Sequence, residues 1–214
     1  MAANDLVLLR RQYRGVAASL LVLLAAPANE VPAAEALPPE QVIATTADSF
    51  ATVVATRYAE LEADLHGNHA LVDEYLLPQF DFTSACRLIL RGHWKTATPE
   101  QQQRFVDAFY RFLLASYGEA LLEFRHDTVK VLPPRENTAG ASTRVRTEMK
   151  MTDGSVFNVD FYMRLDDRGW RIVDVIAEGV SYVRTYRSEF GLEIRADSLD
   201  ALTARLEDVA AKKP

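Results

Sequence analysis

The sequence predicts an α+β domain in which helices come first, a four-stranded antiparallel sheet follows, and C-terminal helices end the chain. Apolar residues recur at helical spacing up to about residue 124, and from residue 127 the period changes to two. The strands follow one another without intervening helices, so the helices are expected on one face of the sheet. The length of 214 residues favours one domain, and the chain lacks the glycine-rich motifs of nucleotide-binding α/β folds.

The first 28 residues have the features of a secretory signal peptide. Three arginines within residues 10–14 form a basic region, and the apolar stretch GVAASLLVLLAA follows over 15–26. That stretch suits a signal peptide and is shorter than the ~20 residues that span a bilayer. Cleavage is expected after residue 28, in the A-x-A pattern at 26–28, with a second possibility at 31–33. The alternatives are an uncleaved amphipathic anchor and an ordinary buried helix. Residues 29–39 are predicted as a flexible lead-in.

The predicted domain covers residues 40–211 and opens with helices. Apolar side chains at helical spacing predict a first helix over 40–65, which Gly67-Asn68 ends. A short helix is expected over 69–76, and this helix is expected to stop before Pro78.

Two further helices precede the strands. One is predicted over 82–91 and is broken by Gly92. The other begins with a capping box formed by Thr98 and Gln101, with Pro99 at the first helical position. It is expected to run to about Phe124, with a broad apolar face: Phe105, Phe109, Phe112, Leu113, Ser116, Tyr117, Ala120 and Leu121.

An antiparallel meander is predicted next, joined by turns at Asp153-Gly154 and Asp167-Arg168-Gly169. Its four strands are expected over 129–131, 143–151, 156–165 and 170–177. Residues 180–190 and 198–211 are predicted to form the closing helices.

The central hairpin has one dry and one wet face. The dry face carries Val145, Thr147, Met149, Phe157, Val159, Phe161 and Met163, whereas the wet face carries Arg144, Arg146, Glu148, Lys150, Asn158, Asp160, Tyr162 and Arg164. Methionines mixed with aromatic rings adapt to irregular apolar ligands, so a sheet covered by helices could enclose a pocket. The same pattern also fits a solid core, because periodicity does not distinguish a filled core from a hollow one.

No residue pattern indicates a metal site or a nucleophile. The pair His66 and His69 straddles a predicted helix break and has no third ligand, and Cys86, as the only cysteine, is expected to be a small buried residue. Asp174 either points inward, as a proton-abstracting Asp does in some α+β pockets, or caps the loop that starts at Glu178. The formal net charge of -6 argues against nucleic acid as a partner.

Seven stretches, taken in order and spacing, carry a resemblance to a known family. They are LPQFDF at 77–82, WKTATPEQQ at 94–102, FYRFLLASY at 109–117, VDF at 159–161, WRIVDVIAEGVS at 170–181, YRSEF at 186–190 and LDAL at 199–202. Together they make residues 40–208 similar to the MlaC, or toluene-tolerance, family of periplasmic phospholipid-binding proteins. One departure is Arg91, which stands where the family often has Gly after the Leu at position 90.

The resemblance implies a nuclear-transport-factor-like fold with an internal lipid pocket between sheet and helices. It implies a periplasmic carrier, with no enzymatic activity and no cofactor, that shuttles phospholipid and maintains outer-membrane lipid asymmetry. The implied partners are an outer-membrane lipoprotein–porin complex and an inner-membrane ABC transporter with an MCE-type subunit, and the carrier is expected to be a monomer. The alternatives are a hopanoid-associated lipid binder, an isomerase or hydratase on a similar fold, and an adaptor domain with a filled core.

The expected lipid-binding residues lie on the long aromatic helix and on the dry face of the sheet. They are Phe109, Leu113, Tyr117, Val145, Met149, Phe157, Val159, Phe161, Met163 and Ile172. Ile172 and Val175 have opposite parity in the fourth strand, so strict alternation would place them on opposite faces.

Overall fold

The computed structural model of the chain describes residues 37–63, 69–118, 129–134, 140–150 and 154–212. The stretch from Ala36 to Pro214 forms one compact unit. The predicted signal peptide lies outside the described residues, as does most of the lead-in. None of the described helices is long and apolar enough to cross a membrane.

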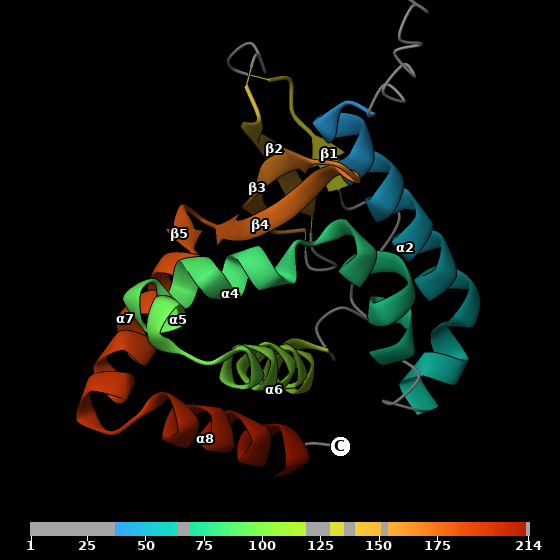
Figure 1. Cartoon of the computed structure of the whole chain (residues 1–214). Coiled ribbons are helices and arrows are strands. Elements are labelled where there is room, and N and C mark those ends of the chain that lie inside the picture. Colours follow the sequence, from blue (N-terminus) through green and yellow to red (C-terminus); the bar gives the residue numbers. More distant parts are fainter. Residues whose placement is uncertain (1–36, 64–68, 119–128, 135–139, 151–153, 213–214) are drawn as a thin grey trace, which may run out of the picture. The chain divides into compact units, whose positions relative to one another are not determined.

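The described elements confirm the α+β class and the order of helices, sheet and helices (Figure 1). The first helical group contains α2 (Pro39–Ala63), the π-helix η1 (Val72–Leu76), the 3-10 helix η2 (Leu77–Gln79), α4 (Phe82–Leu90), α5 (Gly92–Thr96) and α6 (Pro99–Tyr117). The strands are β1 (Val129–Val131), β2 (Ser142–Lys150), β3 (Val156–Asp166), β4 (Gly169–Ala177) and β5 (Val180–Ser181). The closing helices are α7 (Tyr182–Ala196) and α8 (Leu199–Lys212).

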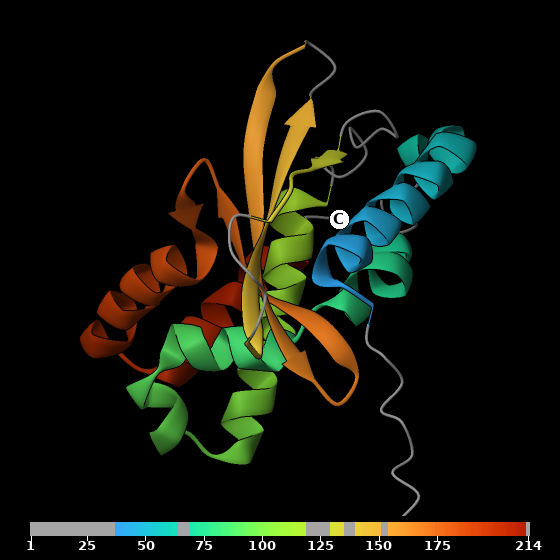
Figure 2. The same cartoon turned by 90° about the horizontal axis from the view of Figure 1, so that it is seen from above.

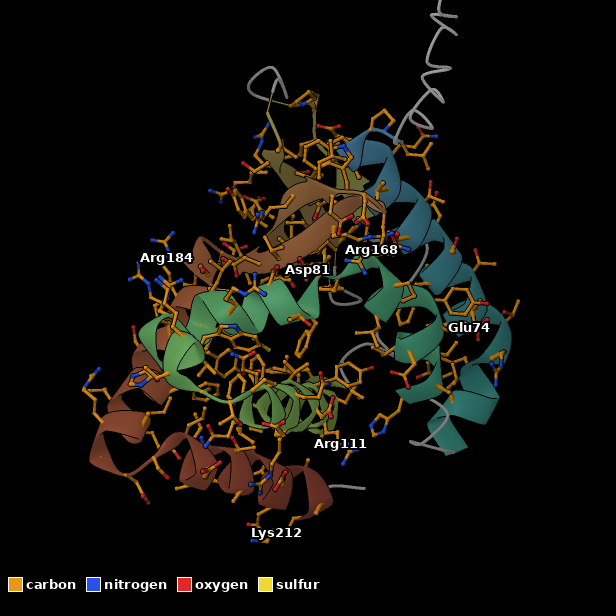
Figure 3. All side chains as sticks on the ribbon, viewed as in Figure 1. Glu74, Asp81, Arg111, Arg168, Arg184 and Lys212 are labelled. Atoms are coloured by element: carbon orange, nitrogen blue, oxygen red, sulfur yellow. The ribbon has the colours of Figure 1, made fainter. Side chains whose placement is uncertain are left out.

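The helices lie against one face of the antiparallel sheet, whose strand order is β1-β2-β3-β4-β5. Figures 1 and 2 show α4, α6 and α8 stacked away from the sheet, while α2 runs along one side. A core of rings and aliphatic groups holds this stack together, with Cys86, Phe105, Phe190 and Leu202 among its buried members. Charged side chains such as Arg111, Arg184 and Lys212 point outward (Figure 3).

The sheet has five strands where the sequence predicted four. The additional strand, β5, covers only Val180–Ser181 and pairs with β4 across a turn in which Glu178 and Gly179 both have positive φ, 47° and 80°. Residues 180 and 181 were predicted as helical, and that prediction is wrong. A two-residue strand is too short to show alternation, and a Glu in the left-handed region gives no turn signal in the sequence.

The capping box at the start of α6 forms as predicted. The Gln101 backbone N–H donates to Thr98 Oγ1 at 3.3 Å, and the Thr98 N–H donates to Gln101 Oε1 at 3.0 Å. The helix reaches Tyr117, and its predicted continuation to Phe124 lies outside the described residues.

One predicted helix boundary is confirmed and another is wrong. The helix predicted over 69–76 ends at Leu76, as η1 does, but an unpredicted 3-10 helix, η2, follows directly, with Pro78 in its first turn, where a missing N–H is tolerated. Gly92 was expected to break the next helix, but it begins α5. The break lies at Arg91, which has φ 48° and ψ -109°.

A β-bulge in β4 positions the site. Phe161 of β3 lies opposite Val175, and Met163 lies opposite Ile172, so the register passes over Val173. An extra residue reverses the alternation of side chains along a strand. Ile172 and Val175 therefore share a face of the sheet, although they are three residues apart.

Candidate functional site

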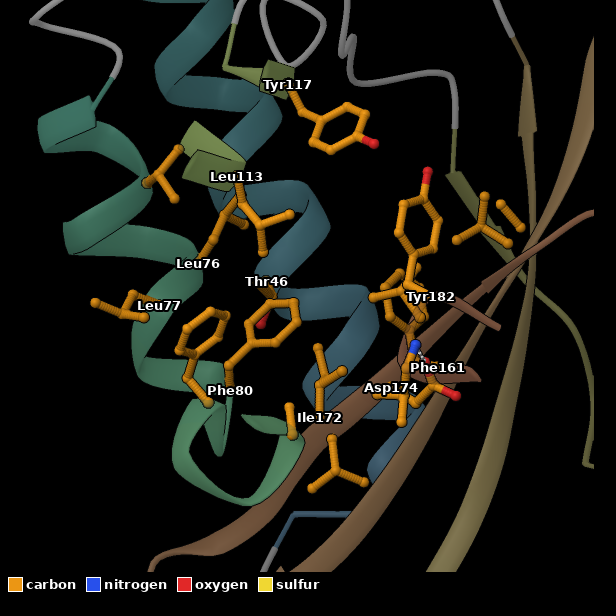
Figure 4. Close-up of a pocket in the computed structure, with 18 of the residues that line it drawn as sticks. Thr46, Leu76, Leu77, Phe80, Leu113, Tyr117, Phe161, Ile172, Asp174 and Tyr182 are labelled. Carbon is orange, nitrogen blue, oxygen red and sulfur yellow. Dashed lines mark hydrogen bonds between the residues drawn. The ribbon is translucent and has the colours of Figure 1, made fainter. Parts of the chain in front are cut away.

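A cavity of about 510 Å³ lies between the sheet and the helices. Its volume falls within the roughly 300–1,000 Å³ typical of small-molecule sites. Figure 4 shows side chains from helices and strands converging on it, with Leu77, Phe80 and Ile172 toward one end and Tyr117 at the other.

The helical side of the cavity is built from single faces of amphipathic helices. On α6, Phe109, Leu113 and Tyr117 follow at intervals of four residues and so lie on one face of the helix. This face lines the cavity. The ring of Phe109 is fixed by Phe82, whose centroid is 5.6 Å away in a stacked arrangement. Further apolar lining comes from α2, η1, η2, the residue that follows η2, and α4: Ile43, Ala47, Phe50, Val72, Leu76, Leu77, Phe80, Ala85 and Ile89.

The sheet side of the cavity uses the dry face of β3 together with the bulged strand β4. Val159 and Phe161 line it from β3, and Val175 and Ala177 lie opposite them in register. Because of the bulge, Ile172 also reaches the lining, and Val173 contributes as well.

Seven of the ten sequence-predicted residues line the cavity, namely Phe109, Leu113, Tyr117, Met149, Val159, Phe161 and Ile172. Val145 and Met163 are buried in the adjoining core cluster, where they do not reach the lining. Phe157 is 44% exposed at the start of β3. Alternation identifies the face of a strand but not how far along that face the cavity extends, and so these three were assigned to it.

Sequence reasoning missed the contribution of the N-terminal helices. Ile43 and Phe50 of α2 and Leu76, Leu77 and Phe80 around η2 all line the cavity. Their apolar spacing was visible in the sequence, but which helix covers which part of the sheet depends on the tertiary packing. The segment around Phe80 is fixed against β4 by a hydrogen bond from the Asp81 N–H to the Ile172 carbonyl at 2.9 Å.

Asp174 was predicted either to point inward or to cap the loop that starts at Glu178; it lines the cavity, and its carboxylate accepts hydrogen bonds at the start of α7. Its Oδ2 accepts a hydrogen bond from Ser181 Oγ at 2.5 Å, and its Oδ1 accepts one from the Val183 N–H at 3.0 Å. Ser181 Oγ in turn accepts from the Arg184 N–H at 3.0 Å. Both carboxylate oxygens are therefore engaged at the start of a helix, where a negative charge is favourable.

Three tyrosines meet at one end of the cavity. The hydroxyls of Tyr117 and Tyr186 are 3.2 Å apart, and the rings of Tyr117 and Tyr182 are 6.1 Å apart. Burial raises the pKa of Tyr186 above its ordinary value. Another lining tyrosine, Tyr110, donates to Asp73, and burial raises the pKa of Tyr110 too.

The described part of the chain contains neither a group of residues that could hold a metal ion nor an exposed cysteine thiol. There, no three His, Cys, Asp or Glu residues gather as a metal site would require, and His66 lies outside it. Cys86 is fully buried, as expected, and burial raises the pKa of its thiol, which keeps it neutral. Asp160 lies on the wet face but is buried beneath Arg144, whose Nε donates to Asp160 Oδ2 at 2.7 Å.

The fold and the site together define an α+β domain built around an apolar cavity, in which the described lining carboxylate is engaged as a helix cap. The chain belongs to the MlaC family, since the family model described as MlaC protein matches residues 44–208. The resemblance drawn from the sequence is thereby confirmed.

Individual relatives agree with this assignment. The chain is 29% identical over 174 residues to the toluene tolerance protein ttg2D of Pseudomonas putida, which covers 80% of this chain and 79% of that protein. It is 19% identical over 170 residues to the intermembrane phospholipid transport system binding protein MlaC of Haemophilus influenzae, which covers 78% and 79%. A solved phospholipid-binding protein of Ralstonia solanacearum, in complex with a phospholipid, superposes with a TM-score of 0.75 at 25% identity, covering 81% of this chain and 97% of that one.

Proposed function

We propose that this protein is an exported phospholipid carrier that holds the acyl chains of its lipid in the cavity between the sheet and the helices. The observation that carries the proposal is the apolar cavity of about 510 Å³ in a fold shared with a phospholipid-binding protein solved with its lipid. Phe109, Leu113, Tyr117, Met149, Val159, Phe161 and Ile172 would contact the lipid there.

The energetic task of a carrier explains the chemistry of the lining. Each buried CH₂ is worth about 0.8 kcal/mol, so a lipid with two long acyl chains does not leave a membrane unaided. An apolar cavity gives those chains an environment comparable to the bilayer interior. Such transfer makes and breaks no covalent bond, so the protein requires no acid, base or cofactor and is not an enzyme. The engagement of Asp174 as a helix cap is consistent with that.

The proposed pathway places the carrier in the periplasm. Residues 1–28 would direct export, and residues 40–211 would form the lipid-binding domain. The carrier would act as a monomer between an outer-membrane lipoprotein–porin complex and an inner-membrane ABC transporter with an MCE-type subunit, and so maintain outer-membrane lipid asymmetry. The name of the Haemophilus influenzae relative, an intermembrane phospholipid transport system binding protein, supports this pathway.

Native mass spectrometry of the mature chain, purified from the periplasm, tests the proposal. We expect a bound species with the mass of a phospholipid at a ratio near one to one, identified by lipid extraction. Ala47→Trp would fill part of the cavity from α2 and should reduce that bound fraction, whereas Ala55→Trp, at an exposed position on the same helix, should not. A protein that is lipid-free under gentle conditions and takes up no lipid from vesicles would rule the proposal out, and a hopanoid in the extract would assign a different lipid.

A further inference from the structure

Three tyrosines are grouped at one end of the cavity, while Thr46 and Asp174 line it nearer to Phe80 and Ile172 (Figure 4). Tyr117, at the end of α6, is 43% exposed, and Tyr182, at the start of α7, is 36% exposed, whereas Tyr186 is 7% exposed. Figure 4 shows Tyr117 and Tyr182 at the same end of the cavity, away from Leu77 and Phe80. The tyrosine end of the cavity is thus an end at which two lining side chains, Tyr117 and Tyr182, are partly exposed to solvent.

This arrangement of tyrosines is held by packing. Tyr182 and Tyr186 are four residues apart on α7 and so share a face of the helix. The ring of Tyr186 packs edge-on against Phe109 at 4.9 Å and lies 5.1 Å from Phe190. A hydroxyl held by rings on two helices can meet a ligand with little loss of side-chain entropy.

The three tyrosine hydroxyls can make more hydrogen bonds than they make within the described part of the chain. The one hydrogen bond among the three hydroxyls joins Tyr117 and Tyr186, and it consumes a single O–H donor. Within the described part of the chain, the hydroxyl of Tyr182 makes no hydrogen bond to a protein group. Since each tyrosine carries one O–H donor and an acceptor oxygen, two donors remain for water or a ligand.

We propose that Tyr117, Tyr182 and Tyr186 form a polar anchor that donates hydrogen bonds to an acceptor oxygen in the glycerol ester region of the lipid. This inference rests on the proposed carrier function and deepens it. The acceptor is either an acyl ester carbonyl or a phosphodiester oxygen, since both lie where the acyl chains meet the polar end. Neutral donors suit both oxygens, and the apolar lining beyond the tyrosines would receive the chains.

The anchor has a consequence for lipid choice. Without a partner oxygen, the two remaining donors would lose hydration on binding and gain nothing in return. A purely hydrocarbon ligand of the same volume is therefore disfavoured relative to an ester lipid. The anchor also leaves the headgroup beyond it near solvent, and so permits tolerance of headgroup type.

The test compares wild type with the Tyr117→Phe/Tyr182→Phe/Tyr186→Phe triple variant, in which every ring is retained. The matched control is Tyr58→Phe, an exposed tyrosine on α2 outside the cavity. Delipidated mature protein is titrated with vesicles of diacyl phosphatidylglycerol and, separately, of its diether analogue, which has the phosphate but no ester carbonyl. Diacylglycerol, which has the carbonyls but no phosphate, is the third probe.

We expect the triple variant to bind the diacyl phospholipid about tenfold more weakly, which corresponds to the loss of one or two hydrogen bonds. If the carbonyls are the acceptors, wild type should also bind the diether more weakly; if the phosphodiester is the acceptor, it should discriminate against diacylglycerol instead. Isotope-edited infrared spectra of lipid labelled at the ester carbonyl report directly whether that carbonyl accepts a hydrogen bond, independently of affinity. Equal binding by wild type and the triple variant would overturn the anchor, whereas a wild type that binds none of the probes would overturn the carrier function itself.

Discussion

Replacing Arg91 with glycine should stabilise the protein, because this exposed residue between α4 and α5 has a backbone conformation that suits glycine. Arg91 joins α4 to α5 with φ 48° and ψ -109°. A Cβ makes this combination unfavourable for every residue except glycine, and such strain costs about 1–3 kcal/mol. The next residue, Gly92, does not have a positive φ, and a Cβ built on it would meet no atom within 4 Å. The glycine therefore stands one residue later than the backbone requires.

The net gain is smaller than the strain. Glycine adds conformational freedom to the unfolded chain, which offsets about 0.5–1 kcal/mol. A stabilisation of about 1 kcal/mol remains, and for a domain of this size it would raise Tm by roughly 2–4 °C. The charge of Arg91 adds a separate effect, because it contributes to lowering the pKa of the Arg187 guanidinium, after the larger effect of burial.

Thermal and urea unfolding of the delipidated mature protein, followed by circular dichroism, would measure this change. Delipidation matters because a ligand that binds the native state shifts the apparent stability. Arg91→Ala removes the charge but keeps the Cβ, so it should not reproduce the gain, whereas Arg91→Gly/Gly92→Ala should retain it. Equal effects of Arg91→Gly and Arg91→Ala would refute the strain argument and assign the change to the side chain.

Two further predictions concern the cap of α7 and the buried acids. Ser181→Ala removes both the cap of the Arg184 N–H and a donor to Asp174, and should lower the unfolding free energy by about 1–3 kcal/mol; Ser188→Ala, an exposed serine of the same helix, should change it little in the same urea titration. Burial raises the pKa values of Cys86, Tyr110 and Tyr186 above their ordinary values of 9.0, 10.0 and 10.0. Above about pH 9–10 the unfolded chain then binds fewer protons than the native protein, so the urea midpoint should fall as pH rises through this range, and a midpoint that is flat from pH 8 to 11 would contradict the burial of these groups.

Local sequence signals identified the elements that depend on local chemistry. The capping box of Thr98 and Gln101 was read correctly because both hydrogen bonds lie within four residues of chain. The order of the four longer strands followed from alternation and turn residues. The family, too, could be inferred from the order and spacing of short stretches, although no single stretch is specific.

Elements that depend on tertiary contacts were missed. The backbone remains helical through Pro78 while the Arg171 guanidinium donates to the Pro78 carbonyl at 2.7 Å, 93 residues away in sequence. The strand β5 exists because Ser181 pairs with Ile176 and also caps α7. Neither contact leaves a local pattern of residues.

The bulge at Val173 shows why alternation alone could not outline the cavity. In a regular strand, Ile172 and Val175 would face opposite sides of the sheet, and only one of them could reach the lining. The extra residue brings both to the cavity face, opposite Met163 and Phe161. It also lets Asp174 turn toward the N-terminus of α7, where Val183 and Ser181 hydrogen-bond to its carboxylate. One inserted residue thus lengthens the apolar wall of the cavity and keeps a charged side chain engaged by hydrogen bonds.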